Sequence, residues 1–176
     1  MRATLAAVFG LLKNKMIITK LSGGLGNQMF QYACGLSLSN KSGTLMKIDT
    51  SAYIQDNLVP GDTIRKFELD KFNISCDYAN IDETQSIKYP LGTLSKIFNF
   101  IYKKLLRVNH LDFHPGLFKM KTSQYLDGYF QSEKNFINVA DTIRKEFTLK
   151  RELIDAAVTE FERKVFMTNS VSIHIR

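Results

Sequence analysis

Three glycines and two side-chain amides gather near the start of the chain, in the segment Ser22-Gly23-Gly24-Leu25-Gly26-Asn27-Gln28. This segment follows the apolar run 16–21 and precedes apolar residues at helical spacing, so it predicts a strand-to-helix turn. Glycines at such a turn expose backbone N–H groups at the helix N-terminus, where an anionic or polar ligand is stabilised. The amides of Asn27 and Gln28 suit sugar hydroxyls or phosphate oxygens, because they both donate and accept hydrogen bonds. The segment therefore predicts a ligand-binding turn.

The same turn partly matches the dinucleotide-binding fingerprint G-x-G-x-x-G. Gly24 and Gly26 supply its first two glycines, but Met29 occupies the third position. Asp49 ends the next predicted strand, near the place of a ribose-binding carboxylate. Two alternatives stay open on these residues: an NAD-binding Rossmann protein, and a tight turn that only lets the helix pack on the strand.

The last residues of the chain are a second group with possible chemistry. The apolar stretch 171–175 predicts a strand that carries His174 and Arg176 on one face. An arginine fork binds phosphate through two hydrogen bonds and stays charged, which suits a diphosphate leaving group. The alternatives are a packed histidine and an exposed terminal arginine.

A predicted strand over 125–130 brings together two tyrosines and a carboxylate. Tyr125, Asp127 and Tyr129 alternate along one of its faces. Aromatic and acidic groups at a strand end can contact an acceptor sugar, and packing on the strand face is the alternative role for the tyrosines. Asp127 is a candidate general base for deprotonating a hydroxyl group.

Composition limits the class of protein. The chain has 176 residues, of which 44% are hydrophobic, as in one compact domain. Its two cysteines lack a C-x-x-C pattern, which indicates reduced thiols in a cytosolic protein. No apolar run is long enough to cross a membrane. Pro115 argues against a helix that would place His110 and His114 together, so no metal site is predicted.

The net charge of +7 is partly concentrated in one region of the sequence. Such a region could meet a phosphorylated substrate, nucleic acid or an anionic membrane surface, or be a solvated basic face. Its members are Lys96, Lys103, Lys104, Arg107, Lys119 and Lys121, opposed only by Asp112.

The elements that must position these residues begin with a β-α-β unit. Its parts are a strand over 16–21, a helix over about 28–40 and a strand over 44–49, which is typical of a parallel α/β layer. Residues 1–15 are interpreted as an upstream extension, with Met16 as the natural start. The later elements are three helices. The first spans 94–108. The second is capped by Ser132 and has a buried stripe of Phe136, Val139, Ala140, Ile143 and Phe147, and the third spans about 151–166 with Leu153, Ala156, Ala157, Phe161 and Val165.

Four segments resemble those of one enzyme family in the same order. The glycine turn through Ala33 is similar to the N-terminal motif of the bacterial and animal α-1,2-fucosyltransferases, glycosyltransferase family 11. Arg65-Lys66-Phe67-Glu68-Leu69 with Phe72 resembles its R-x-[FY]-E-L-x-x-F segment. Residues 125–136 resemble its G-Y-[FW]-Q-S-[EY]-K-Y-F stretch. His174-Ile175-Arg176 looks like the opening of its H-x-R-R-G-D motif.

The resemblance implies a galactoside α-1,2-fucosyltransferase that works without a metal or other cofactor. Such an enzyme transfers L-fucose from GDP-fucose to the 2-hydroxyl of a terminal galactose, with inversion. The implied roles are catalysis for Asn27 and Asp127, and donor binding for Gly23, Gly24, Gly26, Asn27, Gln28, His174 and Arg176. The implied partners are GDP-fucose and a galactose-terminated glycan, with no nucleic acid. The implied location is the cytoplasm, where the protein would make peripheral contact with the inner face of a bacterial membrane.

The implied fold is a Rossmann-like N-terminal α/β domain of a GT-B type glycosyltransferase. Residues 16–169 would form this mainly acceptor-side domain, and 170–176 the first strand of a truncated donor-binding domain. Because the chain stops inside the H-x-R-R-G-D motif, we expect the isolated 176-residue chain to be inactive. A catalytically silent nucleotide- or glycan-binding domain is the alternative.

Overall fold

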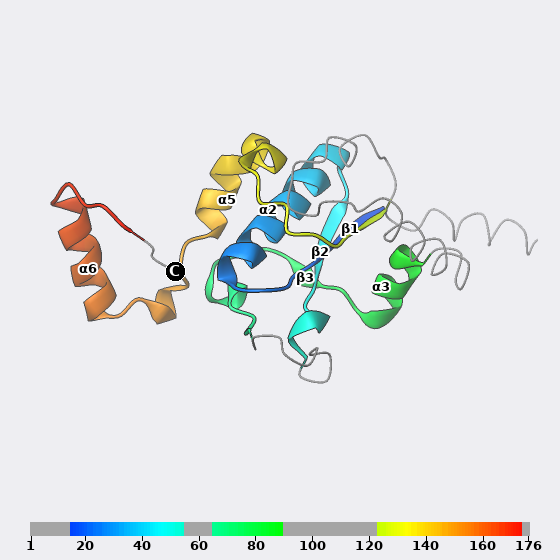
Figure 1. The fold of residues 1–176 in the computed structure, drawn as a ribbon, viewed down its shortest axis with the longest axis horizontal. Helices are drawn as coiled ribbons and strands as arrows, with labels where there is room; N and C mark the ends of the chain where they lie inside the picture. The colour runs from blue at the N-terminus through cyan, green and yellow to red at the C-terminus, as the bar shows by residue number, and fades with distance from the viewer. Residues whose placement is uncertain (1–14, 55–64, 90–122, 174–176) are drawn as a thin grey trace, which may run out of the picture.

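The computed structural model describes residues 15–54, 65–89 and 123–173 (Figure 1). Several expectations from the sequence concern residues outside these ranges. They are residues 1–14 of the extension, the basic region, the helix over 94–108, the pair His110 and His114, and the end residues His174 and Arg176.

Four parallel strands form one sheet in the order β3-β2-β1-β4. Residues 17–19 in the centre of β1 are buried, as is usual in a parallel sheet. The predicted α/β class and the strands predicted over 16–21 and 44–49 are therefore confirmed. The bounds are β1 Met16–Lys20, β2 Leu45–Asp49, β3 Asp77–Tyr78 and β4 Gln124–Leu126.

The strand order reverses beside β1. The chain builds outward from β1 through β2 to β3, and later adds β4 on the other side of β1. In open parallel sheets, ligands bind outside the carboxyl ends of the strands at such a switch point. The topology therefore points to the ends of β1 and β4 as the place for a site.

The helix α2 (Leu25–Ser42) connects β1 to β2 and packs against the sheet (Figure 1). The predicted helix is confirmed, although it starts three residues earlier than expected. It ends at Gly43, whose φ of 62° is the left-handed conformation common at helix ends. Gly35 allows the close packing, since a Cβ atom there would overlap the Oγ1 atom of Thr19 on β1. The buried residues of this layer are Ile17, Cys34, Leu38, Leu126 and Phe130 in one cluster, and Leu21, Tyr32, Ile48 and Leu69 in another.

A second helical layer covers the outer face of α2 (Figure 1). The helix α5 (Ala140–Glu146) buries Ile143 and the preceding Val139 against Ala33. The stripe predicted after Ser132 therefore does pack inward. Its helix is shorter than expected, because two 3-10 turns precede it, and the side chain of Ser132 makes no capping hydrogen bond.

The helix α3 (Ile81–Lys88) follows β3 and lies beside β4 (Figure 1). It begins with a capping box, in which Asn80 Oδ1 accepts from the Glu83 N–H at 2.8 Å and Glu83 Oε2 accepts from the Asn80 N–H at 3.0 Å. The remaining short helices are 3-10 turns over Ser51–Tyr53, Leu69–Lys71, Glu133–Asn135, Ile137–Val139 and Arg151–Leu153.

The strand predicted over 125–130 is wrong beyond Leu126, where β4 ends. The chain turns instead, and Phe130 adopts a φ of 51°, unusual for a bulky residue. Its carbonyl oxygen accepts hydrogen bonds from the Ser132 N–H at 2.7 Å and from Asn135 Nδ2 at 3.1 Å. These two bonds and the burial of the Phe130 ring stabilise the turn against continuation of the strand.

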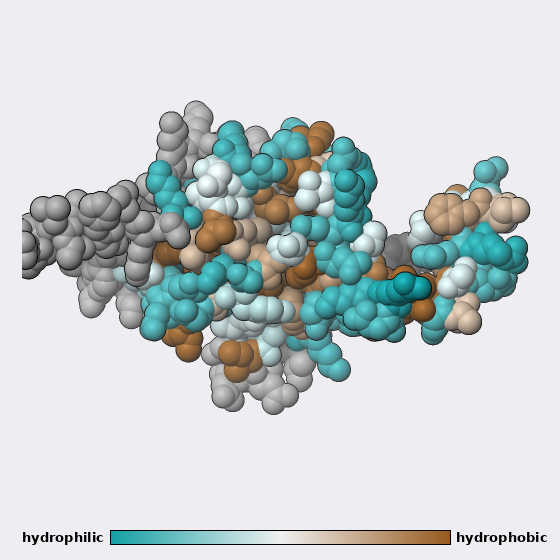
Figure 2. Space-filling model, turned by 180° about the vertical axis from the view of Figure 1, so that it is seen from behind, coloured by the Kyte–Doolittle hydropathy of each residue, from teal (hydrophilic) through white to brown (hydrophobic). Residues whose placement is uncertain are grey.

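The C-terminal part of the described chain also differs from expectation. The helix predicted over 151–166 divides into a 3-10 turn and α6 (Ala156–Phe166), because Asp155 caps a new start by accepting from the Val158 N–H at 2.8 Å. Its residues Phe161, Val165 and Phe166 are exposed, and α6 projects from the body (Figure 2). Residues 171–173 form no strand, since no neighbouring strand of the described ranges pairs with them. None of the helices described here is long and apolar enough to cross a membrane.

Candidate functional site

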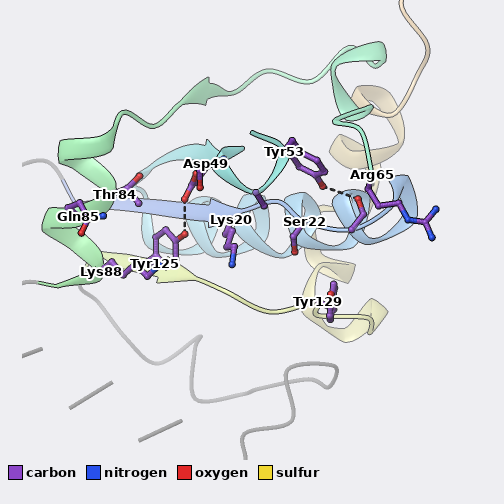
Figure 3. A pocket seen from close by; sticks show the side chains of 13 residues that line it. Lys20, Ser22, Asp49, Tyr53, Arg65, Thr84, Gln85, Lys88, Tyr125 and Tyr129 are labelled. Atoms are coloured by element: carbon purple, nitrogen blue, oxygen red, sulfur yellow. Dashed lines mark hydrogen bonds between the residues drawn. The ribbon is translucent and has the colours of Figure 1, made fainter. Parts of the chain in front are cut away.

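A cleft of about 630 Å³ opens at the carboxyl ends of β1, β2 and β4 (Figure 3). This is the switch point of the sheet, and the volume is in the range of pockets that bind small ligands. The glycine turn borders one end and α3 the other. The lining residues are Lys20, Ser22, Gly23, Asp49, Ser51, Ala52, Tyr53, Arg65, Thr84, Gln85, Lys88, Tyr125 and Tyr129.

A carboxylate and a phenol form the centre of the cleft. Tyr125 donates its hydroxyl to Asp49 Oδ2 at 2.7 Å, and Ser51 donates its backbone N–H to Asp49 Oδ1 at 2.9 Å (Figure 3). Burial, followed by the hydrogen bond to Asp49 and the charge of Asp49, raises the pKa of Tyr125. Tyr125 is therefore a phenol at neutral pH and keeps its proton on the bond to Asp49.

Three cationic side chains line the cleft. Lys88, in the last turn of α3, places its Nζ atom 4.9 Å from the centre of the Tyr125 ring, a cation–π arrangement. Lys20 and Arg65 also line the cleft. The cleft thus combines aromatic faces, one carboxylate and three cations, a set that can hold a polar or partly anionic ligand.

The glycine turn forms one wall of the cleft through Gly23. Gly23 has a φ of 78°, and a Cβ atom there would lie 2.6 Å from Asn27 Nδ2. The hydroxyl of Tyr53 donates to the Gly23 carbonyl at 3.0 Å, and burial raises the pKa of Tyr53. A Cβ atom at Gly24 or Gly26 would meet open space, so within this turn Gly23 is the position that requires glycine.

The two amides of the turn have different surroundings. Gln28 is fully buried, and its amide bonds the backbone of Gly23, Lys66, Glu68 and Leu69 over 2.9–3.1 Å. These contacts fix the segment after residue 64 against α2. Asn27 is partly exposed, and its Oδ1 atom accepts a 2.7 Å hydrogen bond from Gln131. Asn27 is not among the residues that line the cleft, so its donor-binding role stays a prediction, and Gln28 has a structural role in this geometry.

The loop 127–131 joins the cleft to the glycine turn. Asp127 pairs with Lys20 at 3.2 Å, Tyr129 lines the cleft, and Gln131 contacts Asn27. Asp127 itself is not among the residues that line the cleft. The structure therefore brings Gly23, Asn27 and Asp127 into one neighbourhood, whereas His174 and Arg176 lie outside the described residues.

Sequence reasoning did not assemble Asp49, Lys20, Arg65 and the face of α3 into a site. Asp49 was visible as a carboxylate at a strand end, and Arg65 as the first residue of a family-like segment. The contact between Asp49 and Tyr125 depends on β4 pairing with β1, which periodicity does not reveal.

The described residues contain no group of three or more His, Cys, Asp or Glu side chains that could hold a metal ion. Both cysteines are free. Cys34 lies inside α2, where burial raises the pKa of its thiol to about 12.

Comparison with known proteins gives two curated relatives. An alpha-1,2-colitosyltransferase of Escherichia coli is 32% identical over 173 residues, which cover 92% of this chain and 54% of the relative. The O-antigen biosynthesis glycosyltransferase WbnK of Escherichia coli is 30% identical over 172 residues, which cover 89% of this chain and 57% of the relative. No protein-family model and no solved structure matches the chain. The chain spans about half the length of the curated relatives it matches, and these homologues are glycosyltransferases.

Proposed function

We propose that this chain belongs to an α-1,2-glycosyltransferase that transfers L-fucose or a closely related deoxyhexose to the 2-hydroxyl of a terminal galactose, with inversion. The donor is a GDP-sugar, and the described domain is the mainly acceptor-side domain of a GT-B type enzyme. The observation that carries the proposal is the similarity along nine-tenths of the chain to a transferase whose name specifies the α-1,2 linkage. The resemblance of the glycine turn and of residues 125–136 to the fucosyltransferases supports the same linkage.

The cleft supports a sugar ligand in particular. Three tyrosines, Tyr53, Tyr125 and Tyr129, supply aromatic surfaces, and Thr84 and Gln85 supply neutral polar groups. Pockets of this kind hold a ligand by its apolar faces and orient it by a few polar contacts. Arg65, Lys20 and Lys88 add positive charge that stabilises the phosphates of an approaching donor.

The test is a transfer assay on the complete product of the gene that encodes this chain. GDP-fucose and GDP-colitose are each offered with methyl β-D-galactoside, lactose and N-acetyllactosamine, and products are analysed by mass spectrometry and NMR. We expect one donor to give an α-1,2-linked product, and we expect transfer to continue in EDTA, because the proposed reaction uses no metal. Absence of transfer from both donors, or linkage to another hydroxyl, would contradict the proposal.

A further inference from the structure

The least expected group in the cleft is the carboxylate of Asp49. Its residue is only 6% exposed, yet it lines both the 630 Å³ cleft and an adjoining cavity of 210 Å³. Its two partners are neutral, namely the Tyr125 hydroxyl and the Ser51 N–H. Among the described residues, no lysine or arginine forms a salt bridge with it. A buried carboxylate without a cationic partner costs stability, which is typical of functional sites.

The carboxylate of Asp49 has unused capacity to accept hydrogen bonds. An ionised carboxylate offers about four lone-pair positions, and the structure occupies one on each oxygen. The two hydrogen bonds fix the orientation of the group, since one comes from the backbone and the other from the half-buried Tyr125 ring. Asp49 is thus a preorganised acceptor at the wall of a cleft, suited to a ligand hydroxyl.

Asp127, the base candidate from the sequence, is placed less favourably. Its Oδ1 atom pairs with Lys20 Nζ at 3.2 Å, and the residue does not line the cleft. The Lys20 ammonium therefore occupies one oxygen of this carboxylate. Asp49 has no such partner in the described part of the chain and faces the space that a ligand would fill.

We propose that Asp49 binds the reacting hydroxyl of the acceptor sugar and accepts its proton, with Tyr125 as its positioning residue. This inference rests on the proposed function. The hydroxyl oxygen forms a bond to the anomeric carbon of the donor, and the bond from that carbon to the diphosphate oxygen breaks. The bonding electron pair leaves with GDP, the hydroxyl proton moves to the Asp49 carboxylate, and solvent later takes that proton.

Another sugar hydroxyl could use the same carboxylate. Asp49 ends the strand after the glycine turn, where dinucleotide-binding proteins place the carboxylate that binds ribose. The shared chemistry is a sugar hydroxyl that donates to Asp49. Its two sources, galactose and nucleotide ribose, are separated by titrating the chain with methyl β-D-galactoside, GDP and NADH.

The decisive comparison is Asp49→Asn against the matched control Asp141→Asn on the exposed face of α5, in the complete gene product. Asparagine preserves the shape and accepts the Tyr125 hydrogen bond, but it takes no proton at neutral pH. We expect Asp49→Asn to lower kcat by about 10²–10⁴-fold, the usual contribution of a general base, with the acceptor KM changed less than about tenfold. Asp141→Asn should stay within about threefold of the parent, because Asp141 is exposed and pairs with Arg144 away from the cleft. Tyr125→Phe should lower kcat with little change in KM. A kcat for Asp49→Asn within about threefold of the parent would overturn the inference.

A measurement on the unaltered chain covers the case in which Asp49→Asn does not fold. Methyl β-D-galactoside should shift the backbone amide NMR signals of Asp49, Ser51 and Tyr125 more than those of the distant exposed residue Asp141. Shifts at Asp49 with GDP or NADH, and none with the galactoside, would assign the carboxylate to ribose and refute the inference. Absence of transfer by the parent protein would refute the proposed function and the proton transfer with it, whereas transfer that survives Asp49→Asn would refute only the role of Asp49.

Discussion

Replacement of Gln28 by leucine tests the structural role of the most deeply buried amide in the glycine turn. Gln28 Nε2 donates to the carbonyl oxygens of Gly23 at 3.1 Å and Lys66 at 2.9 Å. Its Oε1 atom accepts from the backbone N–H groups of Glu68 at 3.0 Å and Leu69 at 3.1 Å. Leucine has a similar volume and helix propensity, so Gln28→Leu removes four hydrogen bonds while it leaves the packing nearly unchanged.

The size of the loss follows from what happens to each partner. The Gly23 carbonyl keeps its hydrogen bond from the Tyr53 hydroxyl, so it contributes little. The Leu69 N–H is buried and loses its partner, which costs about 1–3 kcal/mol. The other two groups are partly buried and cost about 0.5–1.5 kcal/mol each. We therefore expect Gln28→Leu to lower the free energy of unfolding by about 2–6 kcal/mol, a large share of the roughly 5–15 kcal/mol of a typical domain.

Urea unfolding followed by circular dichroism measures this loss, and hydrogen exchange locates it. The amides of Glu68 and Leu69 should exchange faster in the variant, because the segment after residue 64 is released from α2. Gln131→Leu is the matched control, since Gln131 is exposed and makes one hydrogen bond, to Asn27. A loss below about 1 kcal/mol in Gln28→Leu, with both amides protected as in the parent, would refute the structural role of Gln28.

Three further perturbations test the packing of this domain by urea unfolding. Gly35→Ala should lower the free energy of unfolding by about 1–3 kcal/mol, because the added Cβ atom would overlap Thr19 Oγ1. Gly26→Ala has open space at its Cβ position and should raise the free energy of unfolding by about 0.5–1 kcal/mol. Equal effects of the two substitutions would contradict the packing. Gly23→Ala should cost about 1–2 kcal/mol, since alanine is strained at a φ of 78°, and an unchanged midpoint would count against that conformation. Burial raises the pKa of the Cys34 thiol from 9.0 to about 12, so the contribution of the neutral thiol to stability is complete below pH 9 and is lost as the pH rises to 12. The free energy of unfolding should therefore fall between pH 9 and 12 more steeply in the parent than in Cys34→Ala. Parallel pH curves for the two proteins would contradict this.

The local part of the fold could be predicted from the sequence. The apolar run from Met16, the glycine turn and the helical spacing after it specify β1, α2 and β2, whose contacts are close in sequence. These elements were predictable because hydrophobic periodicity and turn residues act over a few residues.

The site could be predicted only in part, because its contacts are distant in sequence. The partners of Gln28 lie about 40 residues further along the chain, and Tyr125 meets Asp49 across 76 residues. Alternation of side chains predicted a strand through Phe130, but the turn there depends on the side chain of Asn135, which periodicity does not show. The apolar stripe of α6 illustrates the same limit, since a helical pattern specifies a face and not the surface that covers it.

The position of β4 at the edge of the sheet has a consequence for biosynthesis. Asp49 leaves the ribosome 76 residues before Tyr125, and chains elongate at roughly 5–20 residues per second. The β1-α2-β2 unit therefore exists for about 4–15 s before β4 can dock. During that interval one edge of β1 is unpaired, and the Asp49 carboxylate lacks its hydrogen bond from the Tyr125 hydroxyl. A nascent chain in this state exposes a strand edge that can pair with another chain, so slow translation between β2 and β4 should raise the fraction of chains that aggregates. The cleft itself is completed only after most of the chain has been synthesised.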